Sequence, residues 1–174
     1  MCHAPHNVKP TGPLWNHAPS AATYTLYGSS TMDAAVGQPG SSSKLCLSCH
    51  DGTVGILDYA ANTGGMSLGD AYGCVDCFSV LGTNLKNDHP VGITYDAVLA
   101  TADGQLANPE TKTVTIGATM SRTGTLASTM LVSGKVECAS CHDVHNRYTV
   151  GASSRYLLKV STTGSALCLQ CHAK

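Results

Sequence analysis

Three complete copies of the pattern Cys-x-x-Cys-His run through this chain of 174 residues. The pattern is the attachment site of c-type haem: two thiols bond to the porphyrin, and the adjacent histidine binds the iron. Met1-Cys2-His3 reads as the end of a further copy. Numbered in chain order, the first to fourth motifs end at His3, His50, His142 and His172, and their cysteines are Cys2, Cys46 and Cys49, Cys138 and Cys141, and Cys168 and Cys171. A single motif could be chance or half a zinc site, but this repetition predicts four covalently attached haem c groups.

The chain is poor in large apolar side chains, with one Phe and one Trp. Such a chain builds a weak core by itself, and haem macrocycles would supply the missing apolar bulk. We therefore expect a multihaem cytochrome c fold. It would be mostly coil, with short helices at the haem motifs and a few short β-strands, wrapped around a chain of four haems as one domain over residues 1–174.

Charge and hydropathy limit the kinds of partner that this chain can have. The formal net charge is −1 with no basic run, so nucleic acid is not expected as a partner. Charged residues are only 12% of the chain, which indicates a surface partly used for association. No apolar stretch of about 18 residues predicts a transmembrane segment.

Covalent haem attachment takes place outside the cytoplasm, so we expect an exported precursor whose leader has been removed. The first motif lacks its upstream cysteine, which predicts that the chain is truncated within that motif and that Met1 is not an initiator. The alternative is that Cys2 is a free thiol without haem.

The local patterns predict short elements only. Helices are expected through 44–50, capped by Ser42 or Ser43, and through 167–172, starting at Gly164-Ser165. Strands are expected at 92–98, 113–118, 130–137 and 155–160, with a hairpin or small sheet formed by 113–118 and 130–136. The proline-rich stretch 9–20 should be extended, and the long insert 51–137 should wrap the haem array.

The chain has eight histidines, the number that four haems with two axial histidines each require. Those outside the motifs are His6, His17, His89 and His145. Because no iron is left with an open position, and no Cys-x-x-Cys-Lys motif occurs, we expect an electron-transfer protein rather than an enzyme. The alternative distal ligands are methionines, which would raise the potential of that haem: Met32, Met66, Met120 and Met130.

Two motifs continue as Cys-His-x-x-His, which places His6 three residues after His3 and His145 three residues after His142. On a short helix such residues project to the same side, so the second histidine should bind a different haem and bring two haems together.

His17 and His89 lie in loop sequences. Pro90 biases His89 towards an extended backbone. Asn87 or Asp88 could orient a ligand imidazole, or Asp88 could be a turn residue.

One further pair, Cys74 and Cys77, is followed by Phe78 instead of histidine. A local disulfide is the simplest interpretation in an oxidising compartment. A fifth haem, a redox-active dithiol and a zinc site remain as alternatives.

Several segments together carry a resemblance to a known family. They are 2–7, 13–17, 44–54, 87–91 and 136–146. The chain resembles the tetrahaem outer-membrane cytochromes of metal-respiring bacteria, in particular the extracellular kind that polymerises into filaments known as microbial nanowires. The resemblance implies a protomer with little regular secondary structure around a continuous haem chain with parallel-stacked and T-shaped pairs. It also implies that a histidine of one protomer can ligate a haem of the next, for which His6 is our candidate and His17 the runner-up.

The leading hypothesis is therefore a conductive, head-to-tail homopolymer at the outer cell surface or beyond it, exported through the periplasm. It would serve long-range electron transport in anaerobic respiration, passing electrons to other redox proteins or extracellular acceptors. The alternative is a periplasmic or cell-surface tetrahaem shuttle that does not polymerise. An oxyanion reductase is a third, disfavoured possibility.

Overall fold

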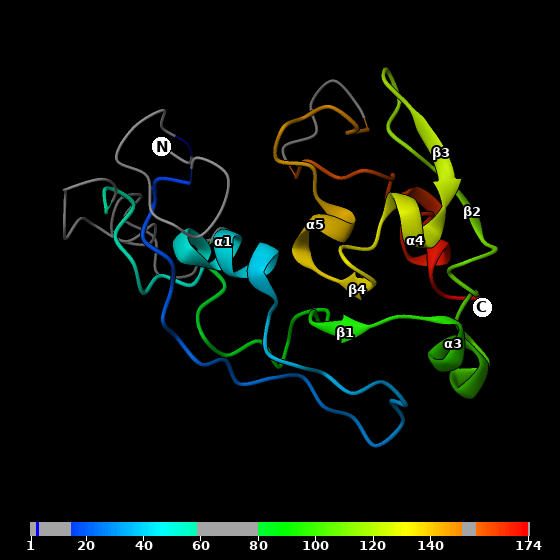
Figure 1. Ribbon diagram of the computed structural model, residues 1–174, viewed down its shortest axis with the longest axis horizontal. Coiled ribbons are helices and arrows are strands. Elements are labelled where there is room, and N and C mark those ends of the chain that lie inside the picture. Colours follow the sequence, from blue (N-terminus) through cyan, green and yellow to red (C-terminus); the bar gives the residue numbers. More distant parts are fainter. Residues whose placement is uncertain (1–2, 4–14, 59–79, 151–155, 174) are drawn as a thin grey trace. The chain divides into compact units, whose positions relative to one another are not determined.

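The structure is a computed structural model that describes residues 3, 15–58, 80–150 and 156–173 (Figure 1). Most of these residues lie in turns and coil, as the sequence predicts. No helix in the described ranges is long and apolar enough to cross a membrane. Cys2, His6, Met66, Cys74 and Cys77 fall outside the described residues, so the roles expected of them stay predictions.

The chain divides into two compact units. Unit 1 comprises Met1–Tyr27 and Ser41–His89, and unit 2 comprises Gly28–Gly40 and Pro90–Lys174. The chain therefore enters unit 2 for a short stretch, returns to unit 1, and then completes unit 2. The expectation of one domain over 1–174 stays a prediction.

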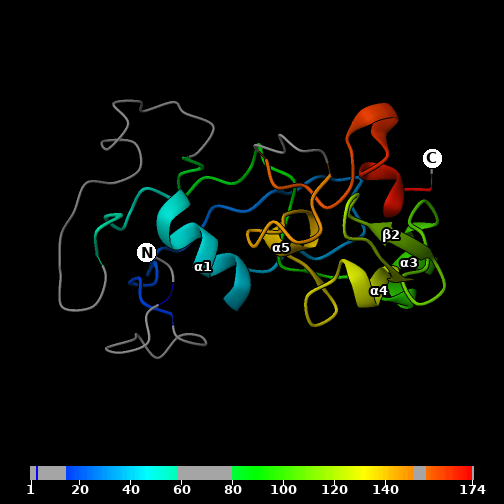
Figure 2. The ribbon, with the colours of Figure 1, turned by 90° about the horizontal axis from the view of Figure 1, so that it is seen from above.

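Unit 1 contains the helix α1, Ser41–His50, which carries the second motif (Figure 2). The helix is predicted correctly, but Ser42 and Ser43 are not its caps, because the helix begins before them and Ser43 is fully buried. Leu47 of α1 packs with Tyr24 and Leu85 in a small core.

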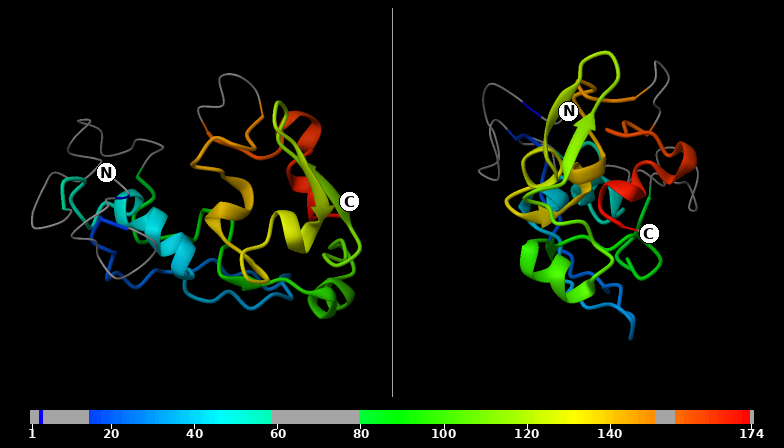
Figure 3. Two further views of the ribbon diagram at one scale, coloured as in Figure 1. Left: turned by 45° about the horizontal axis from the view of Figure 1, so that its top comes forward. Right: turned by 90° about the vertical axis from the view of Figure 1, so that its right-hand side faces the viewer.

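The described part of unit 2 contains two small antiparallel sheets. In one, β1 (Ile93–Thr94) pairs with β4 (Lys135–Val136). In the other, β2 (Thr113–Ile116) pairs with β3 (Arg122–Thr125) as a hairpin (Figure 3). The predicted hairpin or small sheet of 113–118 with 130–136 is therefore wrong. The nearer strand β3 pairs instead, and the Thr115 and Thr123 hydroxyls lie 2.8 Å apart across the ladder.

The other predicted strands are shorter than expected or not formed. The run 92–98 ends as a strand at Thr94, because Asp96 caps the helix α3, Ala97–Asp103, by accepting a 2.9 Å hydrogen bond from the Leu99 amide. The run 130–137 keeps only β4, because Ser133 and Gly134 have positive φ and turn the chain. Of 155–160, residues 156–160 form no strand, and Leu158 makes a single bridge to His142.

The core of unit 2 lies under the β2–β3 hairpin and the helix α4, Leu126–Thr129. Thr125 caps α4 by accepting a hydrogen bond from the Ser128 amide. The buried core residues are Tyr95, Ala100, Val114, Ile116, Leu126, Met130 and Val160. Leu167 and Cys171 of the fourth-motif region pack against this core, so the core supports a haem-attachment segment directly.

Candidate haem-attachment sites

The second motif lies at the C-terminal end of α1. Residues three apart on a helix share a face, so Cys46 and Cys49 present their side chains on one side, as double attachment to a porphyrin requires. Cys46 Sγ donates to the Ser42 carbonyl at 3.6 Å, and His50 ends the helix in an exposed position. The local helix thus pre-forms this attachment site.

His17, a histidine outside the motifs, lies beside the second motif. It is only 2% exposed, and its Nε2 lies 3.6 Å from Cys49 Sγ. Its Nδ1 lies 2.9 Å from the Ala18 carbonyl, and Nε2 lies 2.9 Å from the Gly55 carbonyl. Both carbonyl oxygens only accept, so a protonated ring nitrogen donates to one of them, and the two contacts hold the ring in place beside Cys49.

A hydrogen-bond network ties the segment carrying His17 to the second motif. The Ser20 amide donates to Ser48 Oγ at 3.1 Å, and Ser48 lies inside the motif. The Ser20 and Tyr24 hydroxyls donate to Asp51 Oδ2 at 2.5 and 2.6 Å. Burial raises the pKa of Asp51, but hydrogen bonds from Ser20, Tyr24 and Thr53 outweigh that effect and hold the pKa below its ordinary value.

The third motif occupies the short helix α5, Cys138–Cys141. A capping box starts it, in which the Glu137 amide donates to Ser140 Oγ at 2.9 Å and the Glu137 carboxylate accepts from the Ser140 amide. His142 Nδ1 donates to the Tyr156 carbonyl at 2.6 Å, which fixes the tautomer with its lone pair on Nε2. This histidine therefore has the orientation that an iron ligand needs.

His142 and His145 of the third motif do not lie together on a helix, contrary to the prediction for Cys-His-x-x-His. His142 has φ −105° and ψ 139°, which is extended backbone, so His142 and His145 do not share a helix face. The Asp143 carboxylate instead shapes the loop, accepting from the amides of His145, Arg147 and Tyr148 at 3.2, 2.8 and 2.7 Å. Burial raises the pKa of Asp143, but these bonds and Lys159 bring it below its ordinary value. Whether His145 binds a second haem stays a prediction.

The fourth motif forms short 3₁₀ turns, Thr163–Ser165 and Cys168–Gln170, where an α-helix through 167–172 is predicted. Gly164 has φ 58°, which interrupts regular helix. The motif is held by unit 2: the Tyr95 hydroxyl donates to the Cys171 carbonyl at 3.2 Å, and the Ala107 amide donates to the same oxygen at 2.8 Å. His172 forms a bridge with Leu106.

The thiols of the third and fourth motifs lie close enough to interact electrostatically. The pKa of Cys171 is raised to about 11, mainly by burial and also by the Cys141 and Cys168 thiols, with Lys112 opposing. Burial also raises the pKa of Cys141, with Cys138 and Cys168 contributing and Lys159 opposing. Unit 2 therefore gathers two haem-attachment motifs in one place.

The surroundings of the motifs fit a large, flat group with polar substituents. Val144, Tyr156 and Leu169, which are in or near the third and fourth motifs, are 66%, 59% and 40% exposed, so they offer apolar surface for a porphyrin. Three buried polar atoms have no hydrogen-bond partner within the described residues: Trp15 Nε1, Asn16 Oδ1 and Ser42 Oγ.

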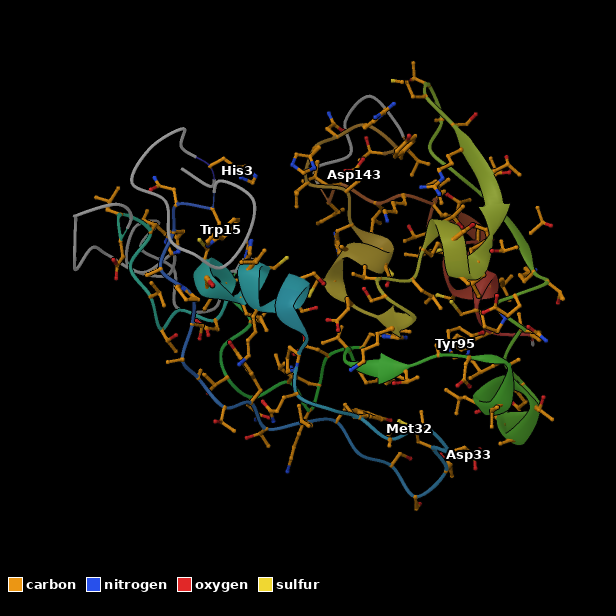
Figure 4. The ribbon with its side chains drawn as sticks, viewed as in Figure 1. His3, Trp15, Met32, Asp33, Tyr95 and Asp143 are labelled. Atoms are coloured by element: carbon orange, nitrogen blue, oxygen red, sulfur yellow. The ribbon has the colours of Figure 1, made fainter. Side chains whose placement is uncertain are left out.

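The described part of the first motif is His3, which pairs with Trp15 (Figure 4). The two rings meet edge to face, with centroids 5.9 Å apart. Trp15 precedes His17 by two residues, so one short segment contacts the first motif and reaches the second.

The other predicted ligands differ in exposure. His89 and His145 are exposed, as is Met120, whereas Met130 is buried in the core of unit 2 and Met32 is half-buried. The sequence reasoning missed Asp51, Asp143, Tyr95 and Lys159, which position the motifs. A signal was present for the aspartates, because each directly follows a motif histidine.

Residues 130–174 match the model of the family described as the doubled CXXCH motif. The matched stretch holds the third and fourth motifs, which the structure brings together. It indicates a multihaem c-type cytochrome with covalently attached haem and a role in electron transfer. The comparison with curated proteins found no match.

Proposed function

We propose that this multihaem c-type cytochrome is the protomer of an extracellular filament that conducts respiratory electrons over long distances. It carries four haem groups, each held by two histidines. Its partners are other copies of the chain, redox proteins and extracellular electron acceptors, reached by export through the periplasm. Haem, when bound, supplies the reversible one-electron chemistry of iron.

The proximity of the third and fourth motifs carries the electron-transfer part of the proposal. Both motifs belong to unit 2, and the Cys141 and Cys168 thiols both raise the pKa of Cys171, which supports close placement of groups attached at these positions. Backbone pairing of His142 with Leu158 and of His172 with Leu106 keeps both attachment segments in place. Adjacent redox centres on a fixed scaffold suit electron transfer between them.

The histidines support two strong ligands for each iron. His142 has its Nδ1 engaged by a carbonyl, and His17 lies buried beside Cys49, so both are oriented by the protein before any metal binds. An iron with two such ligands has no position for a substrate, which favours electron transfer over catalysis.

His6 is the ligand that we assign to the junction between protomers. His17, the other candidate, is 2% exposed and engaged within unit 1, which favours a role inside its own chain. A coordination bond from His6 to the next protomer would make assembly and haem ligation one event.

The test is electron microscopy of the purified protein and of His6→Ala. We expect filaments from the wild type and none from the variant, with the haem content unchanged by the pyridine haemochrome assay. Added imidazole should restore a low-spin spectrum to the variant without restoring filaments, because free imidazole does not tether two chains. Filaments from His6→Ala would contradict the assignment, and a discrete wild-type particle would favour the shuttle.

A further inference from the structure

An aspartate directly follows the motif histidine in the second and third motifs, whereas Ala173 follows it in the fourth. The two aspartates, Asp51 and Asp143, thus occupy the same position relative to an iron ligand. Their surroundings differ in burial, in the kind of hydrogen-bond donor and in the charge nearby.

Asp51 is a buried anion surrounded by neutral donors. It is 4% exposed, and its carboxylate accepts from the Ser20, Tyr24 and Thr53 hydroxyls and from the Thr53 amide. None of its interactions with described residues involves a lysine or an arginine. Among the described residues, the partners of this negative charge are therefore all neutral.

Asp143 is less buried than Asp51, and the positive charge of Lys159 interacts with it. Its carboxylate accepts three backbone amides in the loop after His142. The Lys159 ammonium interacts favourably with this carboxylate and donates to the Ala139 carbonyl, inside the third motif, at 2.6 Å. The third motif thus has a positive charge that partly offsets Asp143.

We propose that Asp51 is a fixed negative charge that lowers the reduction potential of the haem attached at the second motif, whereas Asp143 mainly shapes its loop. Ferric iron carries one more positive charge than ferrous iron, so a nearby anion stabilises the ferric state. The effect is stronger for a buried charge, because solvent and salt screen it less. The inference rests on the proposed electron transfer through haem but not on filament formation.

The test measures the potentials of the haems by spectroelectrochemistry in Asp51→Asn, Asp143→Asn and the control Asp33→Asn, whose side chain is exposed. Asp51→Asn should change the ferric-to-ferrous ratio of one haem about tenfold at a fixed potential, in favour of the ferrous form. Asp143→Asn should change the ferric-to-ferrous ratio of one haem clearly less than tenfold. Asp33→Asn should leave the ratio of every haem unchanged. Glu137, a buried residue directly before Cys138, is the same in all three variants, so it does not contribute to the differences between them.

Two further variants should lower the reduction potential of a haem, whereas Asp51→Asn raises it. Tyr24→Phe keeps the Asp51 charge but removes one donor to it, so it should lower the potential of the haem that Asp51→Asn raises. Lys159→Met should lower the potential of a different haem, and in that background Asp143→Asn should have a larger effect than in the wild type. Tyr24→Phe also provides the test if Asp51→Asn does not fold.

Equal shifts from Asp51→Asn and Asp143→Asn, or unchanged potentials in Asp51→Asn and Tyr24→Phe with all haems attached, would overturn the proposal. The failure of electron transfer itself would look different. In that case the wild-type chain would carry no covalent haem in the haemochrome assay, or its haems would not be reduced reversibly.

Discussion

Tyr95 joins the core of unit 2 to the fourth motif. The side chain is 3% exposed, and its hydroxyl donates to the Ala107 carbonyl at 2.6 Å and to the Cys171 carbonyl at 3.2 Å. Burial, followed by the charges of Cys171 and Asp103, raises the pKa of this phenol well above its ordinary value, so it remains a donor even in alkali. One residue thus supports both packing and haem attachment.

Tyr95→Phe should lower the free energy of unfolding of unit 2 by about 1–2 kcal/mol, because the Ala107 carbonyl loses this donor and the Cys171 carbonyl keeps only the Ala107 amide, while the ring remains. Denaturant unfolding, followed by far-ultraviolet circular dichroism, measures the loss in the free energy of unfolding. Tyr27→Phe, a half-buried tyrosine of unit 1, is the control and should change stability little. An equal loss in both variants would contradict a specific role for the Tyr95 hydroxyl.

At the scale of the elements, the β2–β3 hairpin depends on a glycine. Gly117 has φ +80°, and its amide donates to the Lys159 carbonyl at 2.8 Å. A Cβ at this position would collide with the Met120 carbonyl and lie 3.1 Å from Tyr148 Cα. The turn therefore needs both the left-handed conformation and the space that only glycine provides.

Gly117→Ala should cost at least about 1 kcal/mol more than Gly104→Ala, because both add the left-handed penalty but only the first adds a backbone clash. Gly104 has φ +70° at the end of α3, with nothing within 4 Å of an added Cβ. Thermal unfolding of the two variants gives the comparison. A similar cost for both would show that the hairpin adapts to the methyl group.

The elements also show what can be predicted from the sequence. The motif helix α1 is predictable, because its residues and its chemistry are local. The pairing of Ile93 with Val136 is not, since it joins strands far apart in the sequence and depends on packing of the whole unit. The approach of His17 to Cys49 likewise arises from the Ser20, Ser48 and Asp51 contacts, which no local pattern reveals.

At the scale of the molecule, the two units have cores of different size. Within the described residues, unit 1 has a cluster of three buried side chains, Tyr24, Leu47 and Leu85, whereas the cluster of unit 2 has seven. Stability rises with the apolar area buried, so unit 1 should depend more on the apolar bulk of attached haem.

A haem-free chain, made without the attachment machinery, should therefore lose protection in unit 1 before unit 2. Hydrogen exchange read by mass spectrometry would show fast exchange in α1 while amides of β2 and β3 stay protected. The haem-loaded protein should protect both units. Earlier loss of protection in β2 and β3 than in α1 would contradict this prediction.

The stretch Gly28–Gly40 belongs to unit 2 although it interrupts unit 1 in the sequence, and this affects how unit 2 can be produced alone. Val36 forms a bridge with Ile93, and the Gly40 amide donates to Glu137 Oε2 at 3.2 Å, so this early stretch completes the surroundings of the third motif. A gene fragment that starts at Pro90 would encode both closely placed motifs yet omit one piece of the unit that holds them. Grafting this haem pair onto another protein would instead require a permuted chain, in which residues 28–40 are fused to one end of residues 90–174.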